Sequence, residues 1–294
     1  MRLNPNPYPD LLNSVAQLQQ QINTDNLQIA SGKGINVPSD NPAGAAILTQ
    51  TADQMAGVDQ FQRSVESIQS EMQIADGAVN SVLTSLQQAV SLGLEGSGSI
   101  APGPRAILAT EVQGIQSQLV SLANLTYQGN SVFAGTATQT SAYVLDPNSP
   151  SGVTYQGNTG VNHITLGSNL NLQTNLPGST LFSSPGADMF QSIKDLINGL
   201  ESGNGIPAAV TALGSITNAV TAQRVFYGKA LAQLTAQVTA LNTQTSQLTQ
   251  QAASVGGVNL TSVITNLTSS ETSLQATLTV IGQTAHINLF SFLK

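Results

Sequence analysis

Apolar residues recur every three or four positions near both ends of the chain, which is the spacing of one face of an α-helix. Near the start this stripe contains Leu11, Val15, Leu18, Ile22 and Ile29, with Asp25 at its one polar step. Near the far end it contains Leu260, Ile264, Leu267, Leu274, Leu278, Ile281 and Ala285, with Glu271 at its polar step. Each stripe is too narrow for a globular core and needs a partner helix. We therefore expect the two ends to pack together as a coiled-coil rod.

Longer helical patterns lie between these ends. Steps of three and four residues alternate without a break over 58–89, which predicts coiled-coil packing. Gly and Pro residues interrupt this pattern at 93–104, and a further helix is expected over about 105–125, folded back antiparallel on the preceding one. Helical spacing returns near Asp188 and again from Pro207.

The period of the pattern changes between residues 128 and 186. The runs Val132-Phe133, Tyr143-Val144-Leu145, Val153-Thr154-Tyr155 and Ile164-Thr165-Leu166 favour strands, and residues 170–176 alternate strictly between apolar and polar. Gly, Asn, Pro and Asp separate these runs, as turn residues do. This segment is predicted to be a small β-rich domain.

The fold class expected from these patterns is mainly α: a discontinuous helical bundle with a β-rich insertion. Residues 1–34 and 258–294 would form the terminal coiled coil, with 35–127 and 187–257 as the two parts of a helical core and 128–186 as the outer domain. Between the first two helices, the run Ser31-Gly32-Lys33-Gly34 should end the first one, because Gly readily adopts the left-handed turn that ends helices. Ser39 or Asp40 could cap the second, with Pro42 in its first turn.

The composition argues against several classes of function. Charged residues make up 8% of the chain, its net charge is -7, and its few Lys and Arg residues are not clustered, so nucleic-acid binding is not expected. Cysteine is absent, which removes disulfides and zinc-thiolate sites. No apolar run is long enough to insert in a membrane, and the first residues lack the features of a cleaved signal peptide.

Candidate catalytic residues are equally scarce. His163 and His286 lie in unrelated segments, and Lys33 lacks the neighbouring residues of a phosphate-binding loop. We expect no catalytic, cofactor-binding or metal-binding residues, no cofactor and no enzymatic activity.

Residues 31–44, SGKGINVPSDNPAG, resemble the segment that follows the first helix in bacterial flagellins and their hook–filament junction relatives. The motif positions are Ser31, Gly32, Asn36, Asp40 and Pro42. Three further segments resemble the junction proteins more than filament flagellin: residues 124–135, residues 155–160 and the apolar tail at 285–293.

This resemblance implies a structural subunit of the bacterial flagellum, exported by the flagellar type III apparatus without signal cleavage and located outside the cell. Its partners would be the hook-side junction protein (hook-associated protein 1), flagellin, copies of itself in a ring and a flagellar export chaperone. The expected subunit-interface residues follow both stripes and the tail: Leu11, Val15, Leu18, Ile22, Ile29, Leu267, Leu274, Leu278, Ile281, Ile287, Leu289, Phe290, Phe292 and Leu293.

Two alternatives remain open from the sequence. One is filament flagellin itself, which differs in self-polymerisation. The other is a secreted coiled-coil adhesin or effector with a β head, which leaves the 31–44 motif unexplained.

Overall fold

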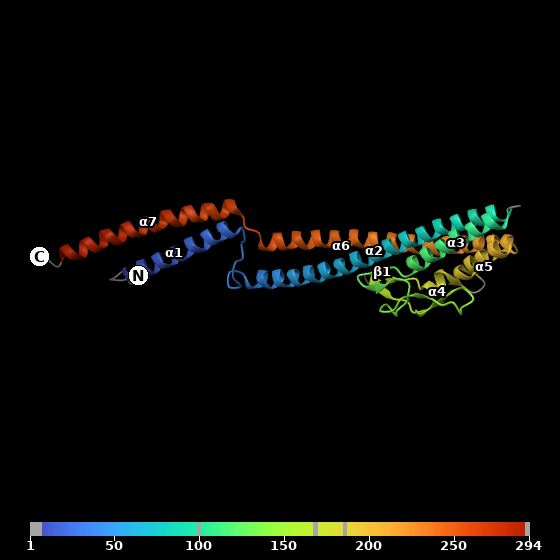
Figure 1. Ribbon diagram of the computed structural model, residues 1–294. Coiled ribbons are helices and arrows are strands. Elements are labelled where there is room, and N and C mark those ends of the chain that lie inside the picture. The colour runs from blue at the N-terminus through green and yellow to red at the C-terminus, as the bar shows by residue number, and fades with distance from the viewer. Residues whose placement is uncertain (1–7, 99–100, 167–169, 185–186, 292–294) are drawn as a thin grey trace. The chain divides into compact units, whose positions relative to one another are not determined.

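The computed structural model describes residues 8–98, 101–166, 170–184 and 187–291. Within these ranges the helices are α1 (Tyr8–Ser31), α2 (Pro42–Gly96), α3 (Pro102–Ala123), α4 (Gly178–Leu181), α5 (Met189–Ser202), α6 (Ile206–Gly256) and α7 (Leu260–Ser291) (Figure 1). The strands are β1 (Thr126–Tyr127), β2 (Asn130–Ser131), β3 (Tyr143–Leu145), β4 (Val153–Tyr155), β5 (His163–Leu166), β6 (Leu170–Gln173), β7 (Ser183–Ser184) and β8 (Ala187–Asp188). Contacts divide the chain into a terminal unit, residues 1–60 with 242–294, and a central unit, residues 61–241.

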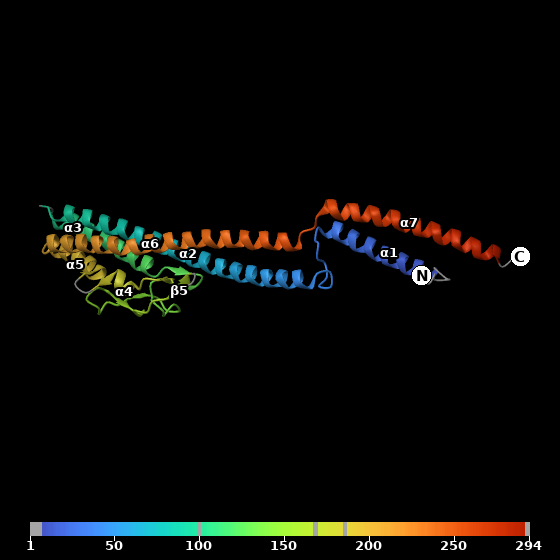
Figure 2. The ribbon, with the colours of Figure 1, turned by 180° about the vertical axis from the view of Figure 1, so that it is seen from behind.

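In the terminal unit, α1 and α7 lie side by side and antiparallel. In both views the two chain ends point the same way, and α7 extends beyond the start of α1 (Figures 1 and 2). The connector after α1 is fastened to the break between α6 and α7, because the Gly34 amide donates to the Gly256 carbonyl at 2.8 Å and Lys33 forms a β-bridge with Gly257. The pairing of the two end helices expected from their stripes is therefore confirmed.

In the central unit, α2 and α6 run antiparallel, and α3 folds back along α2. Cross-helix hydrogen bonds join Gln69 to Thr235 and Gln88 to Glu111. The apolar stripe predicted over 58–89 faces inward, since its members are buried or half-buried. Fully buried side chains from four helices meet there: Val65, Val79, Val82 and Leu86 of α2, Val112 and Leu119 of α3, Ile193, Leu196 and Ile197 of α5, and Leu213 and Leu234 of α6.

The α2 helix continues past the glycine at which the sequence predicted a break. It ends at Gly96, and both Gly93 and Gly96 lie against other helices. A Cβ atom on Gly93 would lie 2.5 Å from the Val210 side chain, and one on Gly96 would overlap the Leu200 side chain. These glycines allow α5 and α6 to pack closely on the end of α2.

The strands form four separate antiparallel pairs, β1-β2, β3-β4, β5-β6 and β7-β8, and no larger sheet occurs among the described residues. The predicted runs at 143–145, 153–155 and 164–166 are strands. The prediction for Val132-Phe133 was wrong, because these buried residues lie in a bend after β2. In the alternating run 170–176, the strand ends at Gln173. The fold is mainly helical with a small middle region of strand pairs, as predicted.

Candidate assembly surfaces

The inner face of α1 carries the stripe predicted from the sequence. Leu11, Val15, Leu18, Ile22 and Ile29 are half-buried, and α1 packs against α7 within the same chain. Asp25, the polar step of this stripe, is the residue of α1 that becomes fully buried, with 2% of its surface exposed. The stripe is thus partly occupied by its own chain.

The inner face of α7 differs from the predicted stripe. The buried or half-buried positions are Val263, Leu267, Ser270, Leu274, Thr277 and Ile281, which again alternate by four and three. Leu267, Leu274 and Ile281 belong to both patterns, but Leu278 is 51% exposed, and Leu260 and Ile264 are 49% and 51% exposed. The expectation that these last three positions lie in the α1–α7 seam was therefore wrong. They form a second face that the chain itself leaves uncovered.

The predicted tail residues are described less fully. Ile287, Leu289 and Phe290 belong to the last turns of α7. Phe292 and Leu293 lie outside the described residues.

The connector at 31–41 is organised by its motif residues. Gly32 ends α1 in the left-handed conformation at φ 68°, and its amide donates to the Gln28 carbonyl. The Ser31 hydroxyl accepts from the Lys33 amide at 3.2 Å, and the Asn36 side chain donates to the Lys33 carbonyl at 3.1 Å. The motif therefore specifies a turn that presents Lys33 to Gly257.

Asp40 holds the second half of this turn. Its Oδ2 accepts from the amides of Asn36 and Val37 at 2.9 and 3.0 Å. These backbone hydrogen bonds, from Val37 first and then Asn36, lower the pKa of the exposed Asp40 carboxyl. Because it folds back on the connector, Asp40 does not cap α2, and neither does Ser39.

The cap of α2 is Asn41, which the sequence reading missed. Its Oδ1 accepts from the Gly44 amide at 2.9 Å, and Pro42 follows as the first residue of the helix, as predicted. The signal that could have found it is the Asn-Pro pair itself, since Asn is a favoured N-cap and Pro a favoured first residue.

An apolar groove of about 490 Å³ opens beside this connector, within the terminal unit. Its walls come from the connector, α2 and the end of α6, with Ile35, Leu48, Met55 and Ala252 among the lining residues.

In the middle region, the segment 124–135 is held by hydrogen bonds between side chains and backbone groups, in places where a neighbouring strand would otherwise bond. Asn124 donates from Nδ2 to the Tyr143 carbonyl at 2.7 Å and accepts at Oδ1 from the Tyr143 amide at 2.8 Å. The Tyr155 hydroxyl donates toward the Phe133 carbonyl at 3.0 Å. Segments 124–135 and 155–160 therefore fold against each other.

Asn158 completes this junction. Its Oδ1 accepts from the amides of Thr136 and Gly160, each at 2.9 Å. Gly135, at φ 71°, lies so close to Asn158 that a Cβ atom there would overlap it.

Aromatic rings pack beneath these turns. The Tyr143 ring lies 5.0 Å from Tyr155 and 4.9 Å from Phe190, and the Phe133 ring lies 5.3 Å from Phe182. Burial raises the pKa of the Tyr143 hydroxyl, so this group stays protonated at physiological pH. The cluster fixes the strand pairs on the helices and offers no open site.

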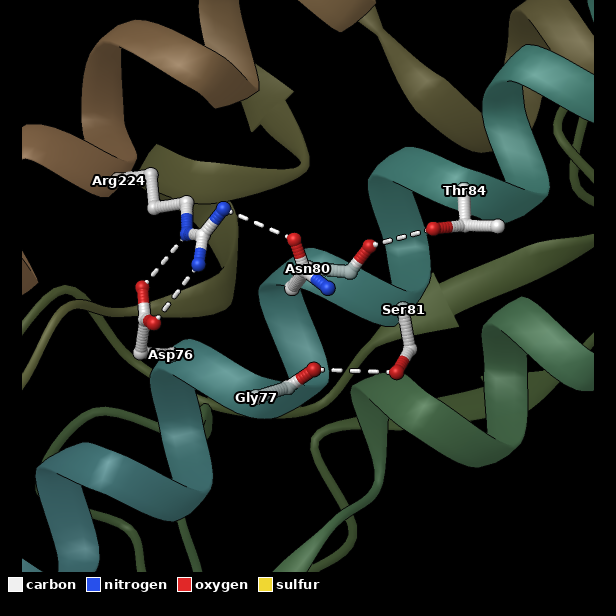
Figure 3. A network of polar contacts seen from close by, with 6 residues as sticks. All are labelled: Asp76, Gly77, Asn80, Ser81, Thr84 and Arg224. Atoms are coloured by element: carbon white, nitrogen blue, oxygen red, sulfur yellow. Dashed lines mark hydrogen bonds and ion pairs between the residues drawn. The ribbon is translucent and has the colours of Figure 1, made fainter.

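A polar network joins α2 to α6 in the central unit (Figure 3). The Arg224 guanidinium donates to both Asp76 oxygens at 2.7 and 2.9 Å, and to Asn80 Oδ1 at 2.8 Å. A bidentate pair of this kind fixes the relative position of two helices. Nothing in the sequence spacing indicates that these residues, far apart in the chain, would meet.

The described residues contain no group of three His, Cys, Asp or Glu side chains that could hold a metal ion. His163 lies exposed on β5. Among the helices that the structure describes, none combines the length and hydropathy that a membrane span requires.

The class of protein to which the first half of this chain is similar follows from its match to a known family. Residues 6–138 match the model of the bacterial flagellin N-terminal helical region. This part of the chain is therefore flagellin-like, and the flagellin resemblance predicted from residues 31–44 is confirmed.

The particular similarity is to flagellar hook-associated protein 3. The protein of that name from Salmonella typhimurium is 30% identical over 118 residues, and the match covers 40% of this chain and 37% of that protein. Polar flagellin F of Vibrio parahaemolyticus is 34% identical over 103 residues, covering 35% of this chain and 27% of the flagellin. The chain thus aligns with less than half the length of these relatives.

Solved structures show the same fold. A protein from Vibrio parahaemolyticus, assigned as a flagellar hook-associated protein, superposes with a TM-score of 0.67 at 20% identity, covering 74% of this chain and all of that one. Bacillus cereus FlgL gives 0.60 at 18% identity, covering 69% of this chain and 99% of its own. At these identities the comparison establishes the architecture.

Proposed function

We propose that this chain is a structural subunit of the bacterial flagellum that joins the hook to the filament as a ring of subunits. The observation that carries the proposal is the uncovered apolar face of α7, at Leu260, Ile264 and Leu278, which flanks the face already paired with α1. Burying the exposed half of a Leu or Ile side chain contributes roughly 1 kcal/mol. Such a face favours contact with neighbouring subunits.

The identity of the relatives supports the junction role within the flagellum. The partners we propose are hook-associated protein 1 on the hook side, flagellin on the filament side, copies of this chain around the ring, and an export chaperone before secretion. The proposed location is extracellular, on the flagellum, and the proposed role is mechanical and not enzymatic.

Filament flagellin is the second candidate, and the similarity to polar flagellin F favours it. The two roles differ in what the purified chain does alone. A flagellin polymerises into long filaments when seeded, whereas a junction subunit forms no extended polymer without its partners.

The experiment is deletion of the chain from its own cells, with electron microscopy of the cell surface and an assay of flagellin in the medium. Hooks without filaments, with flagellin released to the medium, would support the junction role. Normal filaments would contradict both flagellar roles. Absence of filaments with no flagellin inside or outside the cell would identify the chain as the flagellin.

Complementation then tests the surface itself. A triple variant with Leu260→Ser, Ile264→Ser and Leu278→Ser should fail to restore filaments, because it removes the uncovered apolar face. The matched control is Thr261→Ser, Thr265→Ser and Thr279→Ser, which changes neighbouring exposed positions of the same helix. Deletion of residues 287–294 should also abolish filament attachment while leaving the central unit folded, as judged by circular dichroism.

A further inference from the structure

A carboxylate lies buried in the seam between the two terminal helices. Asp25 is 2% exposed and lies on the α1 face that also carries Ile22 and Ile29. Its Oδ1 accepts a hydrogen bond from Gln21 Nε2 at 3.0 Å, one turn earlier on the same helix. Its Oδ2 is buried and has no hydrogen-bond partner.

Among the described residues, no hydrogen bond or nearby cation compensates the burial of Oδ2. Lys33 is the only Lys or Arg among the described residues of the terminal unit. It lies beyond the end of α1 and is exposed. Two helical turns and the start of the connector separate it from Asp25, roughly 12 Å at the rise of an α-helix. A carboxylate oxygen withdrawn from water without a donor or a cation destabilises the structure that buries it.

The other acidic residue at a stripe position behaves differently. Glu271, the polar step in the predicted α7 stripe, is exposed. The chain could therefore have placed Asp25 outward too, but the alternation of Leu18, Ile22 and Ile29 turns it into the seam. An apolar side chain at this position would complete the stripe.

We propose that Asp25 is a built-in control on the α1–α7 pair: it holds the pair in one register and keeps it weak, so that both helices can exchange this contact for contacts with neighbouring subunits. A polar side chain in an apolar helix seam costs stability and disfavours shifted registers, which would place it against other apolar residues. The weakness is a property of the chain alone. The exchange step rests on the assembly role proposed above.

The first test is amide hydrogen exchange on the full-length monomer, read separately for α1, α7 and the central unit. Asp25→Leu should slow exchange in α1 and α7 by about tenfold or more, because a buried carboxyl group with one oxygen left without a partner is replaced by apolar contacts. Asp25→Asn, which removes the charge and keeps the shape, should slow it less. Glu271→Leu is the matched control, since it removes an exposed carboxylate and should leave exchange in the α1–α7 pair unchanged.

Unchanged or faster exchange in both Asp25→Leu and Asp25→Asn would overturn the proposal, because the buried carboxylate would then support the pair. An equal slowing by Glu271→Leu would overturn it as well, since the effect would come from general charge removal. The central unit serves as the internal reference, and its exchange should not change in any variant.

The second test is complementation of cells that lack the chain. The Asp25→Leu chain, secreted in normal amount, should restore fewer filaments than the wild type. Slow exchange with full restoration would overturn the exchange step and leave the weakening effect standing. If the deletion itself does not affect filaments, the proposed function fails, and the hydrogen-exchange result still stands.

Discussion

Replacing Asn124 by Ala removes two hydrogen bonds at once from a buried backbone position. The side-chain amide of Asn124 forms hydrogen bonds with both the backbone carbonyl and the backbone amide of Tyr143, at 2.7 and 2.8 Å, as a neighbouring strand would. Tyr143 is 2% exposed, so the variant leaves two backbone groups poorly reached by water. An unpaired buried polar group costs about 1–3 kcal/mol, and the half-buried Asn124 site admits some water, so we expect the free energy of unfolding to fall by about 2–4 kcal/mol.

Urea unfolding followed by tyrosine fluorescence measures this loss without added probes. The chain has five Tyr residues and no Trp, and Tyr127, Tyr143, Tyr155 and Tyr227 all lie in the central unit. Exchange of the Tyr143 amide should also become faster in the Ala variant. The matched control is Thr126→Ala, an exposed change on the adjacent strand, expected to shift stability by less than about 0.5 kcal/mol. A loss for Asn124→Ala no larger than the control would refute the pairing role.

Three further predictions concern the central unit, each measured by the same urea unfolding. Gly96→Ala should lower stability by about 1–3 kcal/mol because its Cβ atom would overlap the Leu200 side chain, whereas Gly77→Ala, with no atom within 4 Å of the added Cβ, should raise it by up to about 1 kcal/mol. Burial raises the pKa of the Glu71 carboxyl, so the folded state binds the carboxyl proton more tightly than the unfolded state does. Glu71→Gln should therefore raise the free energy of unfolding at neutral pH. This increase should vanish below about pH 4, where Glu71 is protonated in both states. A double-mutant cycle with Arg224→Met and Asp76→Asn should give a coupling of about 0.5–1 kcal/mol that falls at high salt, since the Arg224 side chain is 38% exposed; a coupling independent of salt would contradict a screened ion pair.

The helical core was predictable because one repeated pattern fixes it. The stripe over 58–89 holds its spacing long enough that the buried face of α2 follows directly. The predicted end of α2 was a few residues too early. Glycines that resemble helix breakers, such as Gly93, instead allow close packing against other helices.

The face of α7 could not be settled from spacing alone. Two heptad patterns share Leu267, Leu274 and Ile281, and the sequence favours the more apolar one, which adds Leu278. The structure uses the other, with Thr277 half-buried in place of Leu278. A helix that must satisfy one partner within the chain and others outside it carries apolar residues on two faces, and periodicity does not say which partner takes which.

The motifs of the middle region were recognisable as patterns but not as geometry. Asn124 meets Tyr143, and Asn158 meets Thr136, through side-chain to backbone bonds across loops. Such bonds follow no period, so spacing predicts the strands at 143–145 and 153–155 but not what fastens them. Their effect is to hold two-stranded pairs, which are marginally stable alone, against the aromatic cluster.

The two units differ in how far the chain satisfies itself. In the central unit, side chains of α2, α3, α5 and α6 are fully buried along most of their inner faces. In the terminal unit, the buried residue of α1 is Asp25, and the buried residue among the described side chains of α7 is Val263. The other residues of the α1–α7 seam are half-buried. Because most helical stability comes from packing, this pair would gain far more than the central unit from neighbouring subunits in the proposed assembly. Glu271 is the one charged side chain described on α7, so neighbours can approach its outer face with little electrostatic repulsion. The low charge of this helix and its incomplete burial therefore favour the same event, association of the terminal pair with further helices.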